Sequence, residues 1–181
     1  MNKINWLMLL CLLGPLSASA LPQDWQQQLV IESDTAEFDR KSGIVVYRGH
    51  VELLQGSLKI NADRILLIFN GNTLEQAVAE GSPAHYQQQV NPGKPITQAT
   101  AQRIEYFAGK RELKFRGQAR LIQENNEFSG ELIRYDVMSE TVYAAGSDGH
   151  NSPGEDGKKQ RIKVIIQPNR ANDEDIQDTQ S

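Results

Sequence analysis

The side chains that could carry chemistry in this chain are few and widely spaced. The three histidines, His50, His85 and His150, show no spacing typical of metal ligands. The Gly93-Lys94 step is not followed by serine or threonine in the frame of a phosphate-binding loop, and no serine sits in a nucleophile elbow. These patterns indicate neither a metal site nor a cofactor, and they do not favour nucleophilic or nucleotide chemistry.

Asp34 and Asp63 follow apolar segments in related positions, so they are the carboxylates to compare with an acid–base pair. Such a pair needs two carboxylates that converge in a cleft with separated pKa values, and the spacing does not indicate this. Aspartate commonly accepts hydrogen bonds from nearby backbone N–H groups at turns, and we predict that role for both residues. The acidic stretch 148–156 lacks the alternating oxygen ligands of a calcium loop. The sequence therefore predicts a protein that is not an enzyme.

The first twenty residues have the pattern of an export signal. Lys3 supplies a positive charge, residues 4–16 are apolar but short for a membrane span, and Ala18-Ser19-Ala20 forms a small-residue cleavage site. We predict cleavage between Ala20 and Leu21. The single cysteine, Cys11, leaves with the signal, so the mature chain is predicted to form no disulfide and no thiolate metal site.

The mature chain has room for one domain with a sizeable core, which we place at residues 21–167. Without Lys3, 18 basic and 23 acidic residues remain, a net charge of −5. This balance argues against a nucleic-acid-binding protein, which normally presents a basic face. Residues 168–181 are polar, acidic and without periodicity, so we predict a disordered tail.

A strand–glycine–strand pattern occurs four times in the chain. It is centred on Gly49, Gly81, Gly117 and Gly146, which lie 32, 36 and 29 residues apart. The second half repeats the first at an offset of 68 residues, so that Tyr47-Arg48-Gly49 matches Phe115-Arg116-Gly117. A period near 30 built from pairs of strands predicts a stacked or rolled all-β protein.

Residues 44–55 alternate with period 2, which is typical of a strand and not of a helix. Val45, Tyr47, Val51 and Leu53 fall on one face, and the polar side chains fall on the other. Strands with a single apolar face suit antiparallel pairing, so two sheets or one rolled sheet should enclose the apolar residues.

Shorter stretches of sequence predict the remaining secondary-structure elements. We predict a helical turn within residues 21–28 and short strands at 29–33 and 34–38. Asn70-Gly71-Asn72 favours a hairpin. Weaker strands are expected at 77–79 and 84–90, a strand at 99–107 by its match to residues 33–39, and a surface loop at 148–160.

Several of these residues also carry a family resemblance. The segment Ile31-Glu-Ser-Asp34, the Gly49-x-Val51 step, the run Gln55-Gly56-x-Leu58-Lys59-Ile60-Asn61-Ala62-Asp63 and the later Gly117 repeat closely resemble the LptA family of periplasmic lipopolysaccharide-transport proteins. The resemblance implies an open, twisted β-jellyroll of antiparallel strands. Its apolar interior would hold the acyl chains of lipopolysaccharide while the sugars stay in water.

The resemblance also implies partners and a location. The chain would lie in the periplasm, join head to tail with copies of itself, and link an LptC-like protein anchored in the inner membrane to the periplasmic domain of an LptD-like translocon in the outer membrane. No cofactor and no metal are implied. A separate ATPase would supply the energy.

Two sets of residues follow from combining the resemblance with the alternating pattern. The predicted lipid-binding lining consists of Leu29, Ile31, Phe38, Val45, Tyr47, Val51, Leu53, Leu58, Ile60, Tyr86, Ile104, Tyr106, Leu113, Phe115, Leu121 and Phe128. The predicted head-to-tail joints are the terminal strands at 29–32 and 163–167, through Leu29, Val30, Ile31, Val164, Ile165 and Ile166.

Two other classes of protein remain open at this point. A structural or adhesive β-sandwich subunit would also polymerise through strands, but it would need no lipid-sized groove. A jellyroll carbohydrate enzyme would need a cluster of carboxylates or histidines.

Overall fold

The computed structural model describes residues 24–91, 93–146 and 161–167. The predicted signal peptide, its cleavage site at Ala20 and Leu21, His150, the predicted loop at 148–160 and the acidic tail lie outside these residues. The elements are a short 3-10 helix η1 (Asp24–Gln26) and the strands β1 (Val30–Glu32), β2 (Thr35–Asp39), β3 (Ile44–Gln55), β4 (Leu58–Asn70), β5 (Thr73–Gln88), β6 (Thr97–Phe107), β7 (Glu112–Gln123), β8 (Asn126–Asp136), β9 (Thr141–Ala145) and β10 (Lys163–Ile165).

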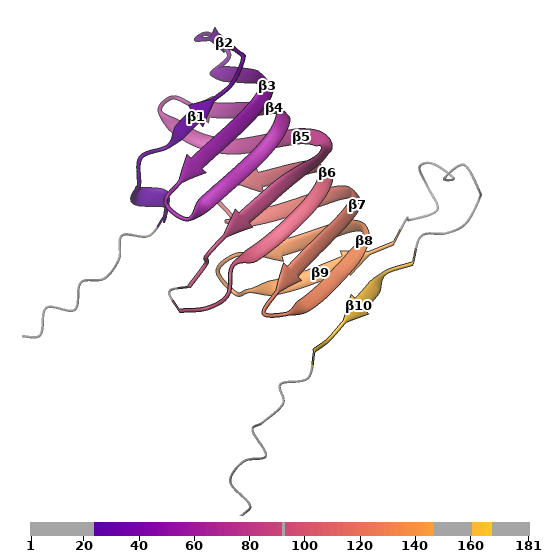
Figure 1. Cartoon of the computed structure of the whole chain (residues 1–181). Helices are drawn as coiled ribbons and strands as arrows, with labels where there is room; N and C mark the ends of the chain where they lie inside the picture. The colour runs from indigo at the N-terminus through magenta and orange to yellow at the C-terminus, as the bar shows by residue number, and fades with distance from the viewer. Residues whose placement is uncertain (1–23, 92, 147–160, 168–181) are drawn as a thin grey trace, which may run out of the picture.

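All ten strands belong to one antiparallel sheet, which confirms the predicted all-β class. The main path runs β1-β3-β4-β5-β6-β7-β8-β10, while β2 also pairs with β3 and β9 also pairs with β8. Neighbouring strands succeed one another along the molecule, with β1 and β2 at one end and β9 and β10 at the other (Figure 1). The sheet does not close on itself, so both ends keep an edge.

Each long strand is bent near its middle, and the bends line up from strand to strand. The pairing register shifts at Arg48/Val51, Asn61/Arg64, Glu80/Ala84, Thr100/Arg103 and Arg116/Ala119. A register shift of this kind is a β-bulge, which bends the strand. The row of bulges therefore folds the sheet into two facing layers.

The repeated glycines lie on this row. Gly49 and Gly117 have φ values of 80° and 77°, which side chains rarely tolerate. A methyl group at Gly49 would overlap the carboxylate of Asp34, and one at Gly117 would overlap the side chain of Gln102. The first and third copies of the sequence repeat therefore mark bends.

We call the two halves layer 1 and layer 2. Layer 1 contains β1, β10 and the half of each strand from β3 to β8 that lies on the ladder between them. Layer 2 contains β2, β9 and the other half of each of these strands. At the ends of the sheet, a bent strand is replaced by two short ones. Ser33 and Asp34 separate β1 from β2, and the segment that follows Gly146 separates β9 from β10, so the fourth sequence copy is a strand pair divided at the bend.

The sequence-based boundaries hold for β3 and differ elsewhere. β3 spans residues 44–55 as predicted. The weaker strands expected at 77–79 and 84–90 are halves of one strand, β5, because Gly81 lies at a bulge and not in a turn. The terminal strands are shorter than predicted: Leu29 precedes β1, and Ile166 follows β10.

Candidate functional site

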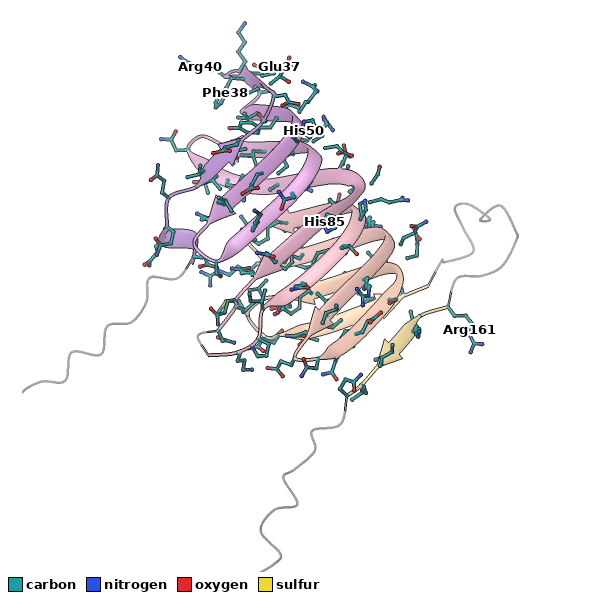
Figure 2. The ribbon with its side chains drawn as sticks, in the orientation of Figure 1. Glu37, Phe38, Arg40, His50, His85 and Arg161 are labelled. Atoms are coloured by element: carbon teal, nitrogen blue, oxygen red, sulfur yellow. The ribbon has the colours of Figure 1, made fainter. Side chains whose placement is uncertain are left out.

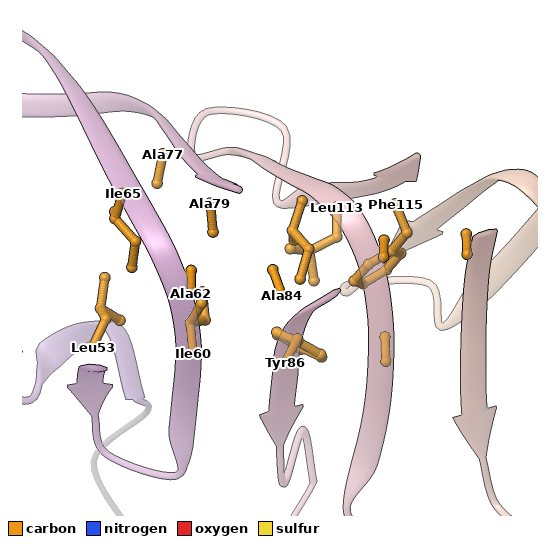
Figure 3. Close-up of a cluster of buried hydrophobic side chains, with 14 of the residues drawn as sticks. Leu53, Ile60, Ala62, Ile65, Ala77, Ala79, Ala84, Tyr86, Leu113 and Phe115 are labelled. Carbon is orange, nitrogen blue, oxygen red and sulfur yellow. The ribbon is translucent and has the colours of Figure 1, made fainter. Parts of the chain in front are cut away.

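The apolar residues gather between the two layers. Ile65, Ala77 and Ala79 of layer 2 face Leu53, Ile60 and Tyr86 of layer 1 (Figure 3). The Tyr86 ring meets the Phe115 ring edge to face, with centroids 5.7 Å apart and planes at 63°. Phe115 lies in layer 2, so this contact joins the layers directly. The interior is thus a single apolar seam between them.

The predicted lining residues occupy this seam at different depths. Most are buried: Val45, Val51, Leu53, Ile60, Tyr86, Ile104, Leu113, Phe115 and Leu121. A second group is partly buried against them: Ile31, Tyr47, Leu58, Tyr106 and Phe128. Leu29 and Phe38 are exposed, and Phe38 projects at the β2 end beside Glu37 and Arg40 (Figure 2). Whether these residues contact a lipid stays a prediction.

Burial is greatest in the middle of the seam and least at its ends. Phe115, Leu121 and Tyr135 have no exposed surface, whereas Phe38 is 69% exposed and Val164 is 43% exposed. Phe38 pairs with buried Val45, and Val164 pairs with Phe128, so both belong to inward-facing rows. A long apolar ligand would therefore meet apolar side chains at either end, and would have to part packed side chains in the middle.

The predicted lining omits several of the most deeply buried residues. Ile65, Leu67 and Ile133 are among the largest fully buried side chains. In β4 the inward positions run through Ile60 and Ala62 and then resume at Ile65, because the bulge shifts the alternation by one residue. The 68-residue repeat, which aligns Ile65 with Ile133, is the sequence signal that could have identified them.

The outer faces of the sheet are polar, and ion pairs connect side chains on them. Glu80 on β5 forms ion pairs with Arg64, whose Nη1 lies 2.8 Å from the Glu80 carboxylate, and with Arg103. Arg103 also forms an ion pair with Glu105, in which Nε lies 3.0 Å from the carboxylate. The hydrogen bond from Arg64, with the charges of both arginines, lowers the pKa of Glu80. A lowered pKa keeps Glu80 ionised, and these ion pairs connect neighbouring strands.

The predicted roles of the two aspartates need correction. Among the described residues, the Asp34 carboxylate accepts no hydrogen bond from a backbone N–H group; it lies 2.9 Å from Nδ1 of His50, a pair that spans the bend beside Gly49. That hydrogen bond, with the charge of Asp34, raises the pKa of His50. Asp63 lies inside β4 at the bulge, and not in a turn. His50 itself is exposed, as its position on the polar face predicts (Figure 2).

The two edges of layer 1 are formed by the predicted joint strands. Within the described part of the chain, β1 pairs with β3 alone and β10 pairs with β8 alone. Each therefore presents unpaired backbone N–H and C=O groups along its free side. Both strands also carry exposed apolar side chains, Val30 on β1 and Val164 on β10. β1 also carries the charged residue Glu32, and β10 carries Lys163. Both edge strands are therefore suitable for pairing with a strand from another chain.

The described ranges also show whether metal-binding groups or membrane-spanning helices are present in them. Histidine, cysteine, aspartate and glutamate residues do not gather there in groups of three or more that could hold a metal ion. Among the same residues, no helix is long and apolar enough to cross a membrane.

Comparison with known proteins identifies the family. Residues 30–141 match the family described as LptA/(LptD N-terminal domain) LPS transport protein. The lipopolysaccharide export system protein LptH of Pseudomonas aeruginosa is 37% identical over 161 residues, covering 87% of this chain and 89% of the relative. The lipopolysaccharide export system protein LptA of Escherichia coli is 27% identical over 177 residues, covering 95% of this chain and 90% of the relative.

A solved structure has the same fold. The crystal structure of LptH from Pseudomonas aeruginosa, described as the LptA-homologous periplasmic component of the conserved lipopolysaccharide transport device, superposes with a TM-score of 0.73 at 36% sequence identity. The match covers 81% of this chain and all of that one. Together with the apolar seam and the open edges, these similarities show that the chain belongs to the LptA and LptD N-terminal domain family of lipopolysaccharide transport proteins.

Proposed function

We propose that this chain carries lipopolysaccharide through the periplasm, with the acyl chains between the two layers and the saccharide outside. One observation carries the proposal: the inward-facing partners are apolar along the whole length of the sheet. In layer 1 the row of paired residues is Ile31, Leu53, Ile60, Tyr86, Ala99, Leu121, Phe128 and Val164.

Layer 2 contains the matching rows. One consists of Phe38, Val45, Leu67, Ala77, Tyr106, Leu113, Tyr135 and Val142. Seven strand spacings of about 4.8 Å make each row about 34 Å long. Such rows offer an acyl chain a continuous apolar path that no charged side chain interrupts.

The energy at stake explains why the path has to be continuous. Burying one CH₂ group contributes about 0.8 kcal/mol, so exposing an acyl chain of about a dozen carbons costs on the order of 10 kcal/mol. A gap in the path would impose part of this cost as a barrier. A lining of aliphatic and aromatic side chains also binds the acyl chain with similar affinity at each position, which permits the lipid to move from one position to the next.

The edges support head-to-tail assembly with further copies. If β10 of one copy pairs antiparallel with β1 of the next, the existing registers place Lys163 opposite Glu32, Val164 opposite Ile31 and Ile165 opposite Val30. On the outer face these pairs join Lys163 with Glu32 and Ile165 with Val30, and on the inner face they join Val164 with Ile31. In layer 2 the same continuation sets Val142 of β9 opposite the exposed Phe38 of β2. The apolar rows would then continue across the joint.

Such an assembly would bridge the two membranes. One end would bind an LptC-like protein at the inner membrane, and the other the periplasmic domain of an LptD-like translocon. Similarity to a family that includes the LptD N-terminal domain supports this arrangement, because a domain of the same fold would offer the same two edges for head-to-tail pairing.

Photo-cross-linking tests the lipid path. A photoreactive amino acid is placed at inward Tyr47, Leu58, Tyr106 or Phe115, and at outward Glu52 or Lys114 as matched controls on β3 and β7. In cells that make lipopolysaccharide, we expect lipid adducts at the inward positions only. Equal labelling of both faces would refute the proposed path.

A further inference from the structure

The two layers meet along a second line, opposite the row of bends. Because every long strand is bent near its middle, the turns at its two ends lie on facing margins of the layers. Layer 1 contributes the β3–β4, β5–β6 and β7–β8 connections, and layer 2 contributes the β4–β5, β6–β7 and β8–β9 connections. We call the space between these margins the lateral opening. A lipid held between the layers can extend its headgroup into water only here or at the ends.

Polar contacts cross the lateral opening in the C-terminal half of the molecule. Glu140, in the β8–β9 turn of layer 2, accepts a hydrogen bond from Nδ2 of Asn91 at 2.5 Å and pairs with Nζ of Lys94 at 3.2 Å. Asn91 and Lys94 belong to the β5–β6 connection of layer 1. Lys94 also pairs with Glu124 of the β7–β8 turn at 2.8 Å, so it is anchored within its own layer. Three connections from two layers thus meet at one ammonium group.

A buried contact lies beneath these residues. Tyr135 of layer 2 is fully buried, and its hydroxyl accepts a hydrogen bond from Nε2 of Gln123 at the margin of layer 1, at 3.3 Å. The side chain therefore spans the seam from one layer to the other. The layers are joined here by directional bonds as well as by apolar packing.

The local backbone holds Glu140 in place for this contact. Asp136 accepts hydrogen bonds from the backbone N–H groups of Met138 and Ser139, each at 2.9 Å, which fixes the turn. Glu140 has a φ of 53°, a left-handed conformation that is uncommon for a residue with a side chain. Hydrogen bonds to Glu124 and Glu140 also raise the pKa of Lys94, so its charge is maintained at neutral pH.

The first half of the chain differs at the matching positions. The 68-residue repeat places Leu67 where the second half has Tyr135, and Asn72 where it has Glu140. Leu67 is buried and has no hydroxyl group to reach the other layer. The two halves of the repeat thus share a fold but differ in how their layers are joined.

We propose that Asn91, Lys94 and Glu140 form a clasp over the C-terminal half of the lateral opening, and that the headgroup of a transported glycolipid must open it. The inference rests on the proposed function, because it needs a lipid between the layers. It assigns these three residues a positioning role: they hold the lateral opening shut until a lipid arrives, and they set how fast a headgroup passes β6 to β9.

The test compares two variants that remove one carboxylate each. Glu140→Gln weakens the clasp, whereas Glu127→Gln weakens the Arg120–Glu127 pair, which has contacts at 2.8 Å but lies on the outer face within layer 1. Uptake of lipopolysaccharide with a fluorescent acyl chain is followed by stopped flow on the purified chain. We expect uptake about two- to five-fold faster in Glu140→Gln, the range for losing one partly exposed ion pair. Glu127→Gln should match the wild type.

The outcomes separate the clasp from the carrier function. Uptake by all three proteins at one rate, or slower uptake by Glu140→Gln, would overturn the clasp and leave the proposed function intact. Absence of uptake by the wild type would overturn the proposed function, and the clasp with it. If Glu140→Gln unfolds, as judged by circular dichroism, Lys94→Gln breaks the same contact from the other layer and is expected to give the same acceleration.

Discussion

Placing a carboxylate on the inward side of β10 tests the proposed joint most directly. Val164 pairs with Phe128 within the chain and is 43% exposed, because no strand covers its other side. In the assembled state it would lie opposite Ile31 of the next copy, inside the continuous apolar row. Val164→Glu should therefore disrupt association while leaving most of the folded monomer unchanged.

The size of the effect follows from burial and charge. Fully burying a valine side chain contributes about 1.5–3 kcal/mol, so covering the exposed part of Val164 contributes about 0.6–1.3 kcal/mol to association. A carboxylate at the same place adds a desolvation penalty of several kcal/mol. A combined loss of at least about 3 kcal/mol corresponds to association weakened on the order of 100-fold.

Sedimentation velocity over a range of concentrations measures this change. Wild-type chain should form a ladder of oligomers, and Val164→Glu should sediment as a monomer at concentrations where the wild type is assembled. Gln98→Glu is the matched control, because it adds the same charge to an exposed position on β6, far from both edges. Equal oligomer distributions for Val164→Glu and wild type would show that β10 is not the joint.

Two further predictions concern the row of bends. Gly49→Ala should lower the free energy of unfolding by about 1–3 kcal/mol in a urea titration, because Gly49 has a φ of 80° and a methyl group there overlaps Asp34; a change within error would mean that the bend does not need glycine. The His50 pKa, followed by NMR, should lie above its ordinary value and fall in Asp34→Asn, because Asp34 stabilises the imidazolium. A raised pKa means that this pair stabilises the fold below about pH 6.5 and that its contribution is lost as pH rises through the folded-state pKa. The His50 side chain is 93% exposed, so the effect on overall stability should be small, and an unchanged His50 pKa in Asp34→Asn would contradict the assignment.

The sequence predicted the strands of this fold well because two regular patterns mark them. Alternation with period 2 located β3 to the residue, and the 68-residue repeat related β3 and β4 to β7 and β8. The recurring glycine also had a physical meaning that alternation alone could not supply. It marks the bulge where the sheet bends, and a bulge needs a backbone conformation that glycine adopts readily.

Other features depend on contacts that sequence does not encode locally. The inward positions of β4 change parity at its bulge, so strict alternation could not place Ile65 and Leu67 in the seam. Asn91, Lys94 and Glu140 are polar residues in turns, where such residues are common, and only the folded sheet brings them together. The extent of packing between the layers was equally hidden, because alternation gives the direction of a side chain and not its neighbours.

The topology explains how a packed interior can still accept a lipid. Among the residues that the structure describes, every strand pairing lies within one sheet, so these parts of the two layers are continuous with each other along the row of bends. Parting the layers about this row breaks no ladder of backbone hydrogen bonds. It separates apolar contacts such as that between Tyr86 and Phe115, together with the few directional bonds near Glu140. Acyl chains that enter would replace the apolar contacts with equivalent ones, so the cost of opening is recovered on binding. The bonds near Glu140 have no such replacement in an acyl chain, and for this reason the C-terminal half of the lateral opening should resist a lipid more than the N-terminal half.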